Sequence, residues 1–421
     1  MKQYDIVVVG GGPAGLMASG CAAATGCSVL LLEKMDQCGR KLCITGKGRC
    51  NITNIKKWDD FSAHIYPQSD PLRPAFRSFS NRDVVSFFTR IGIYSQRERG
   101  DRIFPLCESA PMVRDALVKW AAKEGVEIVT GARVAALASA NNKIVSIQYR
   151  RQGRALSVAC GALVLATGGY SFPLTGSEGD GHRMAADLGH KVTPCFPALT
   201  GLMPKDYDRR LQALTLNNVG LGLKIDGDLV REEFGEVLFT DQGIEGSLGY
   251  RLSRQVVSAM SMGRQVSLVL NLKAAIPPEQ LEARLHRDVE RLGAEQVAIF
   301  LRHYMPRELV LPFMNYLDFW ASDLMSGLKP EQVQKLWQGL QHWEVPIVRY
   351  GGFDRAIVTA GGVSLTDVRK KDMRSRIVEN LFFGGELIDL DGDTGGYNLQ
   401  IAFSTGALAG KKAAELVQAK V

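Results

Sequence analysis

The chain has 421 residues, of which 46% are apolar and 23% are charged, and its net charge is +7. These values exclude a disordered chain, and no apolar run approaches the roughly 18 residues that a membrane span needs. The 44 glycines are an unusually large share without a three-residue period, which excludes a collagen, and the mild positive charge suits anionic ligands while permitting nucleic-acid binding.

The first predicted elements form a βαβ unit. Residues 4–9 are a β-branched run typical of a strand buried on both faces, and a glycine turn at 10–15 leads into a helix over 16–25. A second apolar strand over 28–32 ends at Glu33. Strand, glycine turn, helix and terminal acid together predict a dinucleotide-binding unit.

Each residue type in this unit has a physical role. Gly10 permits the tight turn, Gly12 lets backbone approach a pyrophosphate, and Gly15 allows the helix to pack on the sheet. The N–H groups at the start of the helix attract phosphate. Glu33 can accept hydrogen bonds from an adenosine ribose and would repel a 2′-phosphate, so we expect FAD or NAD rather than NADP.

A second glycine-rich loop occupies residues 39–54. It contains Arg40, Lys41, Lys47 and Arg49, followed by hydrogen-bonding side chains such as that of Asn51. Its glycines favour close approach to the diphosphate and ribityl chain of a cofactor. The alternative is a solvated basic loop on an RNA-binding face.

The middle of the chain continues the α/β pattern. A helix is expected over 112–124, strands over 126–129 and 132–134, and a buried strand over 162–166 that ends in Thr167-Gly168. This ending resembles the second FAD contact of the glutathione-reductase-like superfamily, whose backbone near the position of Val134 meets the adenine. No second G-x-G-x-x-G opens a helix, so a nicotinamide donor would bind without a Rossmann domain of its own.

The sequence pattern changes between about 194 and 349. Short alternating runs over 199–272 predict antiparallel strands of a small barrel or sheet, and residues 277–343 are expected to be helical. The helical part contains six aromatic residues that are expected to form its core, with a substrate pocket as the alternative: Phe300, Tyr304, Phe313, Tyr316, Phe319 and Trp320.

The chain then returns to the first domain. A last strand near 380–383 precedes Gly384-Gly385-Glu386, and a helix of small residues runs from Gly396 to about Gln418. In flavoproteins of this superfamily an Asp after the last strand binds the ribityl hydroxyls, and Glu386 stands in its place. The N-terminus of the final helix would stabilise negative charge on reduced flavin.

The chain resembles the BaiN/YhiN-like family of bacterial flavoproteins, also called the BaiN/RdsA family of NAD(P)/FAD-dependent oxidoreductases. The resemblance rests on the 10–15 motif, Glu33, "GRKLCITGKGRCNITN" and the later segments 100–110, 165–190, 234–253 and 384–410. One departure lies at 243–250, where the family usually has a sequence like "GISGPALL". The substrate side of this chain is therefore expected to differ from that of better-known members.

The resemblance implies an α/β fold: a Rossmann-like, glutathione-reductase-type FAD-binding domain with an inserted β-barrel-like subdomain and a helical cap. The expected boundaries are 1–195 for the first part of the FAD domain, 196–275 for the β-rich insertion, 276–345 for the cap, 346–375 for the β-rich return and 376–421 for the C-terminal part of the FAD domain.

Three functions remain open, and the resemblance favours the first. The first is a reductase that passes hydride from NAD(P)H through FAD to an activated C=C bond, in a steroid- or bile-acid-like small molecule or in uridine of ribosomal RNA. The second is an amine or amino-acid oxidase that produces peroxide, and the third is an RNA-binding flavoprotein with structural FAD. An RNA substrate would favour a basic rim, with these candidates: Lys205, Arg209, Arg210, Arg369, Lys370, Lys371, Arg374 and Arg376.

The expected site is a cofactor site without metal. No proton donor can be assigned from the sequence, although His64, Tyr66, Cys107, Tyr250 and Tyr397 are possible. The eight cysteines form no Cys-x-x-Cys, and free thiols without a secretory signal favour the cytoplasm. The predicted cofactor-binding residues are Gly10, Gly12, Pro13, Ala14, Gly15, Glu33, Lys34, Arg40, Lys41, Thr45, Gly46, Gly48, Arg49, Cys50, Asn51, Val134, Ala166, Thr167, Gly168, Gly385, Glu386, Gly396, Tyr397, Asn398, Leu399 and Gln400.

Overall fold

The computed structural model describes residues 2–419 and divides the chain into two compact units. The first unit consists of Met1–Pro197 and Ala356–Val421, and the second of Ala198–Arg355. Both ends of the chain therefore build one unit, as the sequence predicts. The boundaries differ at 356–375, which were assigned to a β-rich return: these residues belong to the first unit, and only β17 (Trp343–Tyr350) returns to the barrel.

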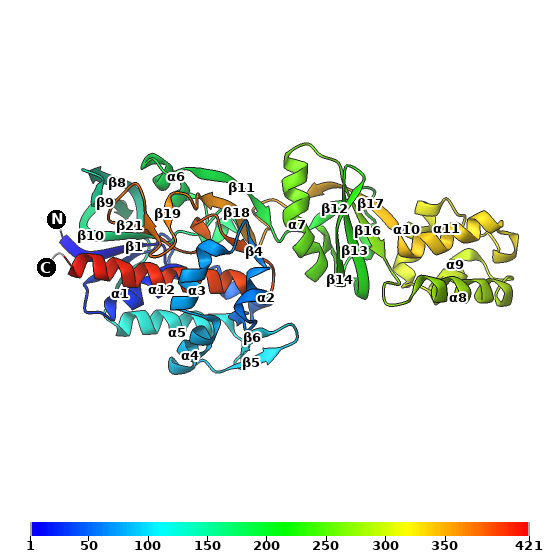
Figure 1. Cartoon of the computed structure of the whole chain (residues 1–421), viewed down its shortest axis with the longest axis horizontal. Helices are drawn as coiled ribbons and strands as arrows, with labels where there is room; N and C mark the ends of the chain where they lie inside the picture. Colours follow the sequence, from blue (N-terminus) through cyan, green and yellow to red (C-terminus); the bar gives the residue numbers. More distant parts are fainter. Residues whose placement is uncertain (1, 420–421) are drawn as a thin grey trace. The chain divides into compact units, whose positions relative to one another are not determined.

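A sheet of nine strands forms the centre of the first unit (Figure 1). Its main path runs β19-β20-β21-β10-β1-β2-β7, and β9 and β8 extend from β10. The four pairings β21–β10, β10–β1, β1–β2 and β2–β7 are parallel. The strands are β1 (Lys2–Val9), β2 (Val29–Leu32), β7 (Glu127–Val129), β8 (Arg133–Ala140), β9 (Lys143–Arg151), β10 (Arg154–Leu165), β19 (Val368–Arg369), β20 (Arg374–Ser375) and β21 (Leu381–Phe383).

The register of the parallel strands brings their carboxyl ends to one edge of the sheet. Val9 is paired with both Leu32 and Leu165, and Leu165 is paired with Phe383. The residues that follow continue this alignment through backbone hydrogen bonds: the Gly10 N–H donates to the Leu32 carbonyl at 2.9 Å, and the Ala166 N–H donates to the Val9 carbonyl at 2.9 Å. Gly10, Glu33 and Ala166 therefore meet at this edge.

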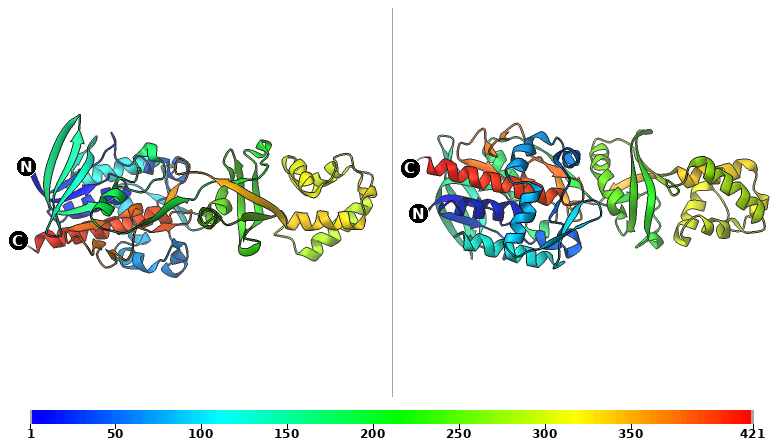
Figure 2. Two further views of the ribbon diagram at one scale, coloured as in Figure 1. Left: turned by 90° about the horizontal axis from the view of Figure 1, so that it is seen from above. Right: turned by 60° about the horizontal axis from the view of Figure 1, so that its bottom comes forward.

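Two helices from opposite ends of the chain lie side by side against this sheet. They are α1 (Pro13–Ala23) and α12 (Tyr397–Gln418), blue and red in Figures 1 and 2. Glycines permit their close contact: a Cβ on Gly406 would lie 2.3 Å from the Ala14 carbonyl oxygen, and one on Gly410 would lie 2.1 Å from that of Ala18. Small residues along α12 thus act as a packing surface rather than only as good helix formers.

The remaining elements of the first unit surround this core. A small antiparallel sheet has the order β3-β6-β5, β22 pairs with β4, and β11 pairs with β18. The strands are β3 (Thr53–Asn54), β4 (Ile65–Tyr66), β5 (Ser95–Glu98), β6 (Arg102–Pro105), β11 (Val192–Ala198), β18 (Val358–Val363) and β22 (Asp391–Gly392). The helices are α2 (Trp58–Ser62), α3 (Arg73–Ser78), α4 (Asn81–Arg90), α5 (Ala110–Lys123) and α6 (Asp180–Asp187).

The second unit combines a closed barrel with helices, as predicted for the insertion. The barrel order is β12-β15-β14-β13-β16-β17. Its other strands are β12 (Leu202–Pro204), β13 (Thr215–Ile225), β14 (Asp228–Thr240), β15 (Gly243–Glu245) and β16 (Val266–Asn271). The helices are α7 (Gly246–Ser261), α8 (Pro278–Arg291), α9 (Val297–Phe300), α10 (Arg307–Leu317) and α11 (Pro330–Gln341).

One hydrophobic core joins the barrel and the helical part of the second unit. Among the six aromatic residues expected in that core, Phe300, Tyr304, Phe313 and Phe319 are buried, whereas Tyr316 is 41% exposed and Trp320 is 77% exposed. The core interpretation therefore holds for four of them. Among the described residues, no helix is long and apolar enough to cross a membrane.

The contact between α1 and α12 gives a stability prediction. Replacing Gly406 with Ala places a methyl group against the Ala14 backbone, which cannot rotate away as a side chain could. We expect this overpacking to lower the free energy of unfolding by about 1–3 kcal/mol, measured by urea titration. Gly327→Ala is the control, because a Cβ there meets no atom within 4 Å; equal stability of the two variants would contradict the role of Gly406.

Candidate functional site

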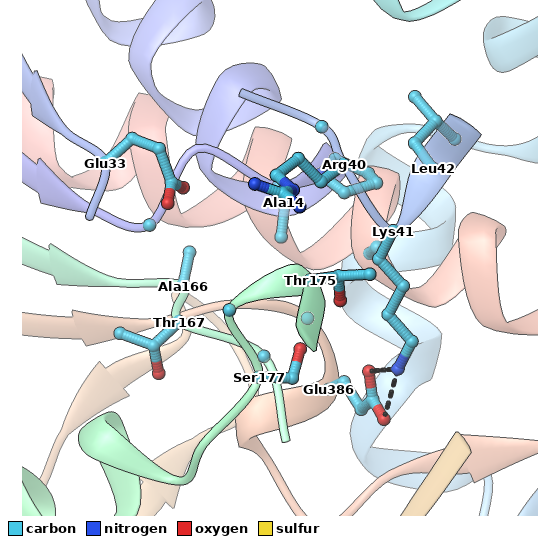
Figure 3. Close-up of a pocket in the computed structure, with 18 of the residues that line it drawn as sticks. Ala14, Glu33, Arg40, Lys41, Leu42, Ala166, Thr167, Thr175, Ser177 and Glu386 are labelled. Atoms are coloured by element: carbon cyan, nitrogen blue, oxygen red, sulfur yellow. Dashed lines mark hydrogen bonds and ion pairs between the residues drawn. The ribbon is translucent and has the colours of Figure 1, made fainter. Parts of the chain in front are cut away.

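A pocket opens at the sheet edge where β1, β2 and β10 end. It is lined by residues from the β1–α1 turn, from the end of β2, from the loop around 37–45 and from the start of α12. Figure 3 shows Glu33 on one side of this pocket, Ala166 and Thr167 below it, and Lys41 with Glu386 at the other end. All of the lining residues belong to the first unit.

Gly10, Gly12 and Gly15, the spaced glycines of the motif, have the surroundings that dinucleotide binding requires. Gly10 has a φ of +102°, and a Cβ there would lie 2.5 Å from the Ala166 carbonyl oxygen. A Cβ on Gly15 would lie 1.8 Å from the Gly10 carbonyl oxygen, so only glycine allows α1 to start here. A Cβ on Gly12 would meet nothing within 4 Å, which leaves backbone open toward the pocket it lines.

Glu33 is held rigidly at the end of β2. One carboxylate oxygen accepts a hydrogen bond from the Gly11 N–H at 2.6 Å, and the other accepts one from the Met35 N–H at 2.7 Å. Glu33 is 9% exposed, and this burial raises its pKa although the two N–H groups oppose the effect. The remaining lone pairs of the carboxylate face a lining where a ribose hydroxyl can donate to them.

A charge network lies beside Glu33. Asp180, at the start of α6, accepts hydrogen bonds from Lys34 at 2.6 Å and from Arg133 at 3.2 Å, and it also pairs with Arg183. Burial alone would raise the pKa of Asp180, but the bond from Lys34 and the nearby arginines outweigh it and lower the pKa. This network ties β2, β8 and α6 together around one end of the pocket.

An ion pair marks the other end. The Lys41 Nζ lies 2.9 Å from a carboxylate oxygen of Glu386, and both side chains are 21% exposed (Figure 3). Glu386 also accepts a hydrogen bond from the Thr359 N–H at 2.7 Å. The pair joins the loop after β2 to the segment after β21. Two predicted residues that are 345 positions apart in the sequence are therefore in direct contact.

The start of α12 closes the lining at this end. Asn398 accepts a hydrogen bond from the Gly392 N–H at 2.8 Å and donates to the Gly392 carbonyl at 2.7 Å. These bonds fix the first turn of the helix, whose residues Asn398 and Leu399 line the pocket. The helix therefore presents its positive end to the same cavity as α1 does.

Most of the predicted cofactor-binding residues lie in the lining. They are Gly10, Gly12, Pro13, Ala14, Glu33, Lys34, Arg40, Lys41, Thr45, Val134, Ala166, Thr167, Gly168, Gly385, Glu386, Asn398 and Leu399. The structure places the others outside it: Gly15, Gly46, Gly48, Arg49, Cys50, Asn51, Gly396, Tyr397 and Gln400. Their roles in cofactor binding remain predictions.

Three of the residues outside the lining have other contacts. The Arg49 guanidinium pairs with Glu98 and with Glu108, and it stacks over the Phe104 ring at 4.3 Å from the centroid. Gln400 is fully buried and accepts a hydrogen bond from the Thr53 hydroxyl at 2.6 Å. Gly396 has a φ of +99°, and a Cβ there would lie 2.4 Å from the Thr53 carbonyl carbon.

The lining also contains residues that are not among the predicted ones. Thr175, Gly176 and Ser177 come from the segment between β10 and α6, and Asp180 is the first residue of α6. Gln37 and Arg133 complete the end near Glu33. The resemblance covers this stretch in its segment 165–190, but no motif with a fixed spacing assigns a contact to these residues. The basic side chain of Arg133 stands next to the predicted Val134, which is buried.

The proton-donor candidates have different surroundings. The Nδ1 of His64 lies 2.8 Å from a carboxylate oxygen of Asp393, and the ring stacks on Tyr397 at 4.6 Å between centroids. Cys107 is exposed, and Tyr250 belongs to the second unit. All eight cysteines are free, and the part of the chain from 2 to 419 contains no cluster of three metal-ligating side chains.

The chain matches known proteins over nearly its full length. The family model described as HI0933-like protein Rossmann domain matches residues 4–412. A 3-dehydro-bile acid delta(4,6)-reductase of Clostridium scindens is 29% identical over 415 residues, which cover 97% of this chain and 99% of that protein. A ribosomal RNA dihydrouridine synthase of Escherichia coli is 28% identical over 410 residues, 96% of each.

Solved structures agree on the fold. A 3-ketosteroid delta1-dehydrogenase from Sterolibacterium denitrificans has a TM-score of 0.54 at 15% sequence identity, with 99% of this chain and 100% of that chain covered. Together with the family match, this confirms the predicted Rossmann-type FAD-binding fold. The pocket fits that cofactor, because its bare turn backbone and its buried acid suit the two phosphates and the ribose.

The contacts of Glu33 predict its contribution to cofactor affinity. Glu33→Ala removes the carboxylate and leaves the Gly11 N–H without its acceptor. Hydrogen bonds to a charged group contribute about 1.5–3 kcal/mol, so we expect FAD affinity to fall roughly 10- to 150-fold. The measurement is fluorescence titration of apoprotein with FAD. The exposed Glu415→Ala is the matched control, and unchanged affinity in Glu33→Ala would contradict the assignment.

The burial of His182 predicts that the free energy of unfolding depends on pH. Its ring stacks on Tyr170 at 5.0 Å and is 2% exposed, and burial lowers its pKa from 6.5 to about 4 despite the nearby Glu386 carboxylate. The unfolded chain then binds a proton more readily than the folded chain between these values. The free energy of unfolding should therefore fall by up to about 3 kcal/mol from pH 6.5 to 4.

His182→Phe tests this, since it keeps an aromatic ring without a titrating group. Urea unfolding of both proteins is measured at several pH values across the same range. The wild-type protein should lose stability relative to the variant as the pH falls. Parallel pH profiles would show that His182 does not contribute to the acid sensitivity.

Proposed function

We propose a reaction for this chain, which belongs to the HI0933-like Rossmann-domain family and is an FAD-dependent oxidoreductase: reduction of an activated carbon–carbon double bond with electrons from NAD(P)H. Two full-length relatives support it. One is named a bile acid delta(4,6)-reductase and the other a ribosomal RNA dihydrouridine synthase. Both names describe addition of two hydrogens across a C=C bond that is conjugated to a carbonyl group.

One structural observation carries the proposal: two helices from opposite ends of the chain begin in the same pocket. The start of α1 has the open backbone of Gly12, which can receive the diphosphate of FAD. The start of α12 contributes Asn398 and Leu399 at the other end. A positive helix end beside the flavin ring favours negative charge on it, which makes reduction easier.

The bound cofactor supplies the hydride chemistry, and the chain supplies binding, orientation and charge. Glu33 would hold the ribose, and Lys41 with Glu386 would hold the polar chain between diphosphate and ring. The eight cysteines are free, which is typical of proteins in a reducing compartment. We therefore propose that the protein is cytoplasmic. The substrate is a small molecule or RNA, because relatives of both kinds align along the whole chain.

Reduction of the flavin by a nicotinamide donor tests the direction of the reaction. Purified holoprotein should absorb near about 450 nm, and anaerobic NADH or NADPH should bleach that band. The bleached protein should regain its colour with an α,β-unsaturated keto-steroid or with uridine-containing RNA. The saturated ketone and dihydrouridine-containing RNA are the matched controls, because they lack the double bond.

Two results would contradict the proposal. If neither nicotinamide bleaches the flavin, the chain is not an NAD(P)H-dependent reductase. Bleaching by an amine, followed by peroxide formation in air, would establish an amine oxidase instead.

A further inference from the structure

A second concave site lies in the first unit, outside the FAD pocket. We call it the basic cleft, and it has a volume of about 490 Å³. It is built on the hairpin of β19 and β20; Figure 1 labels β19. Five of its eight lining residues are cationic, and one is acidic; the charged residues are Arg369, Lys370, Lys371, Arg374, Arg376 and Glu379.

Neighbouring acids neutralise only some of this charge. Arg369 pairs with Asp372 at 3.4 Å, and Lys370 pairs with Asp70 at 2.6 Å. Glu379, the one acid of the lining, pairs with Lys143 at 3.1 Å. Within residues 2–419, Lys371 and Arg376 are exposed and have no acid within ion-pair distance.

Arg374 gives the cleft a buried donor. Its Nε is inaccessible to solvent and has no hydrogen-bond partner among the described residues. An unpaired buried donor on a charged group costs stability, and an anion bound beside the guanidinium would offset part of that cost. Its position between Lys371 and Arg376 puts three cations without an acidic partner around one concavity.

The hairpin that carries these residues is fixed in place. Val368 is paired with Ser375, and the Met373 carbonyl accepts a hydrogen bond from the Phe383 N–H at 2.9 Å. Ser375 is buried, and its hydroxyl lies 2.6 Å from the Nε2 of His190. The cations therefore project from a preorganised support, which reduces the entropy lost when they bind an anion.

We propose that the basic cleft binds the phosphate backbone of RNA. A series of closely spaced cations matches a chain of phosphates, one charge per nucleotide, better than it matches a single small anion. The concave shape receives a protruding strand, whereas a flat anionic membrane cannot enter it. The lining contains no aromatic side chain on which a base could stack, so recognition is independent of sequence.

This inference rests on the proposed reductase function and deepens it, because it identifies RNA as the substrate class. The cleft is separate from the FAD pocket: no residue lines both. It would anchor the backbone while a base is reduced elsewhere on the same molecule. Affinity for RNA and reduction of the flavin can therefore be measured independently.

The test compares two doubly substituted holoproteins. K371Q/R376Q removes two exposed cations of the cleft, and R150Q/R154Q removes two exposed cations of the β9–β10 hairpin in the same unit. Binding of a fluorescein-labelled single-stranded RNA 20-mer is measured by anisotropy from 50 to 300 mM KCl. R374K is a third variant that keeps the charge at the partly buried position.

The salt dependence gives a quantitative expectation. Each phosphate contact on a single strand contributes about −0.7 to the slope of log affinity against log salt. K371Q/R376Q should therefore weaken the slope by about 1.4 and lower RNA affinity about 25-fold at roughly 0.1 M KCl. R150Q/R154Q should change affinity less than about threefold, and R374K should retain most of the binding.

Four outcomes would overturn the proposal. Equal losses in both double variants would show general electrostatic attraction rather than a site. Absence of RNA binding by the wild-type protein would exclude the ligand. Competition by millimolar NADPH or inorganic phosphate as effective as that by RNA would indicate a small-anion site, and equal loss of binding to phosphatidylglycerol vesicles in K371Q/R376Q would indicate a membrane site.

The flavin provides the check on the proposed function itself. K371Q/R376Q should be bleached by NADH or NADPH at the wild-type rate, because neither residue lines the FAD pocket. Loss of RNA binding with intact bleaching supports the cleft. Failure of bleaching in the wild-type protein would reject the reductase function while leaving the RNA-binding result interpretable.

Discussion

The structure depends on one constraint: the carboxyl edge of a parallel sheet must present bare backbone to a long ligand. The register of Val9 with Leu32 and Leu165 brings three strand ends to one place, and the following residues cannot carry side chains freely there. A Cβ at Gly10 would meet the Ala166 carbonyl, and a Cβ at Gly15 would meet the Gly10 carbonyl. Part of the excess of glycine in the composition is therefore a consequence of geometry at this edge and along the α1–α12 contact, and many other glycines adopt positive φ in turns.

Charged groups lie at both ends of the pocket. Glu33 supplies a buried acceptor at one end, and its raised pKa shows that the two N–H groups only partly offset its burial. Lys41 and Glu386 pair at the other end, where α12 begins. Two helix N-termini lie between and beside them, so anionic groups are stabilised by fixed dipoles rather than by mobile side chains. Such an arrangement loses little to reorganisation when the flavin charge changes.

The sequence predicts the backbone of this site better than its side-chain partners. Gly10, Gly12 and Glu33 follow from spacing, because a strand, a turn and a helix dictate where each must lie. Arg49 stands in a basic glycine-rich loop just as Lys41 does, yet it pairs with Glu98 and Glu108, and no local pattern reports those acids. The stretch from Thr175 to Asp180 lies in the resembling segment 165–190, yet spacing assigns no contact to its residues, since their place in the lining depends on a network with Lys34 and Arg133.

The segment 243–250 shows why a resemblance predicts a cofactor better than a substrate. Its backbone keeps strict requirements: Gly246 has a φ of +79°, and a Cβ there would lie 2.7 Å from the Leu238 nitrogen. Its side chains depart from the family pattern and introduce a polar pair, in which the Tyr250 hydroxyl is hydrogen-bonded to the Glu245 carboxylate. Burial raises the pKa of Glu245, and burial with the adjacent carboxylate raises that of Tyr250. The backbone of this segment is therefore fixed by the fold, whereas the polar pair belongs to its side chains, which a resemblance in backbone motifs does not predict.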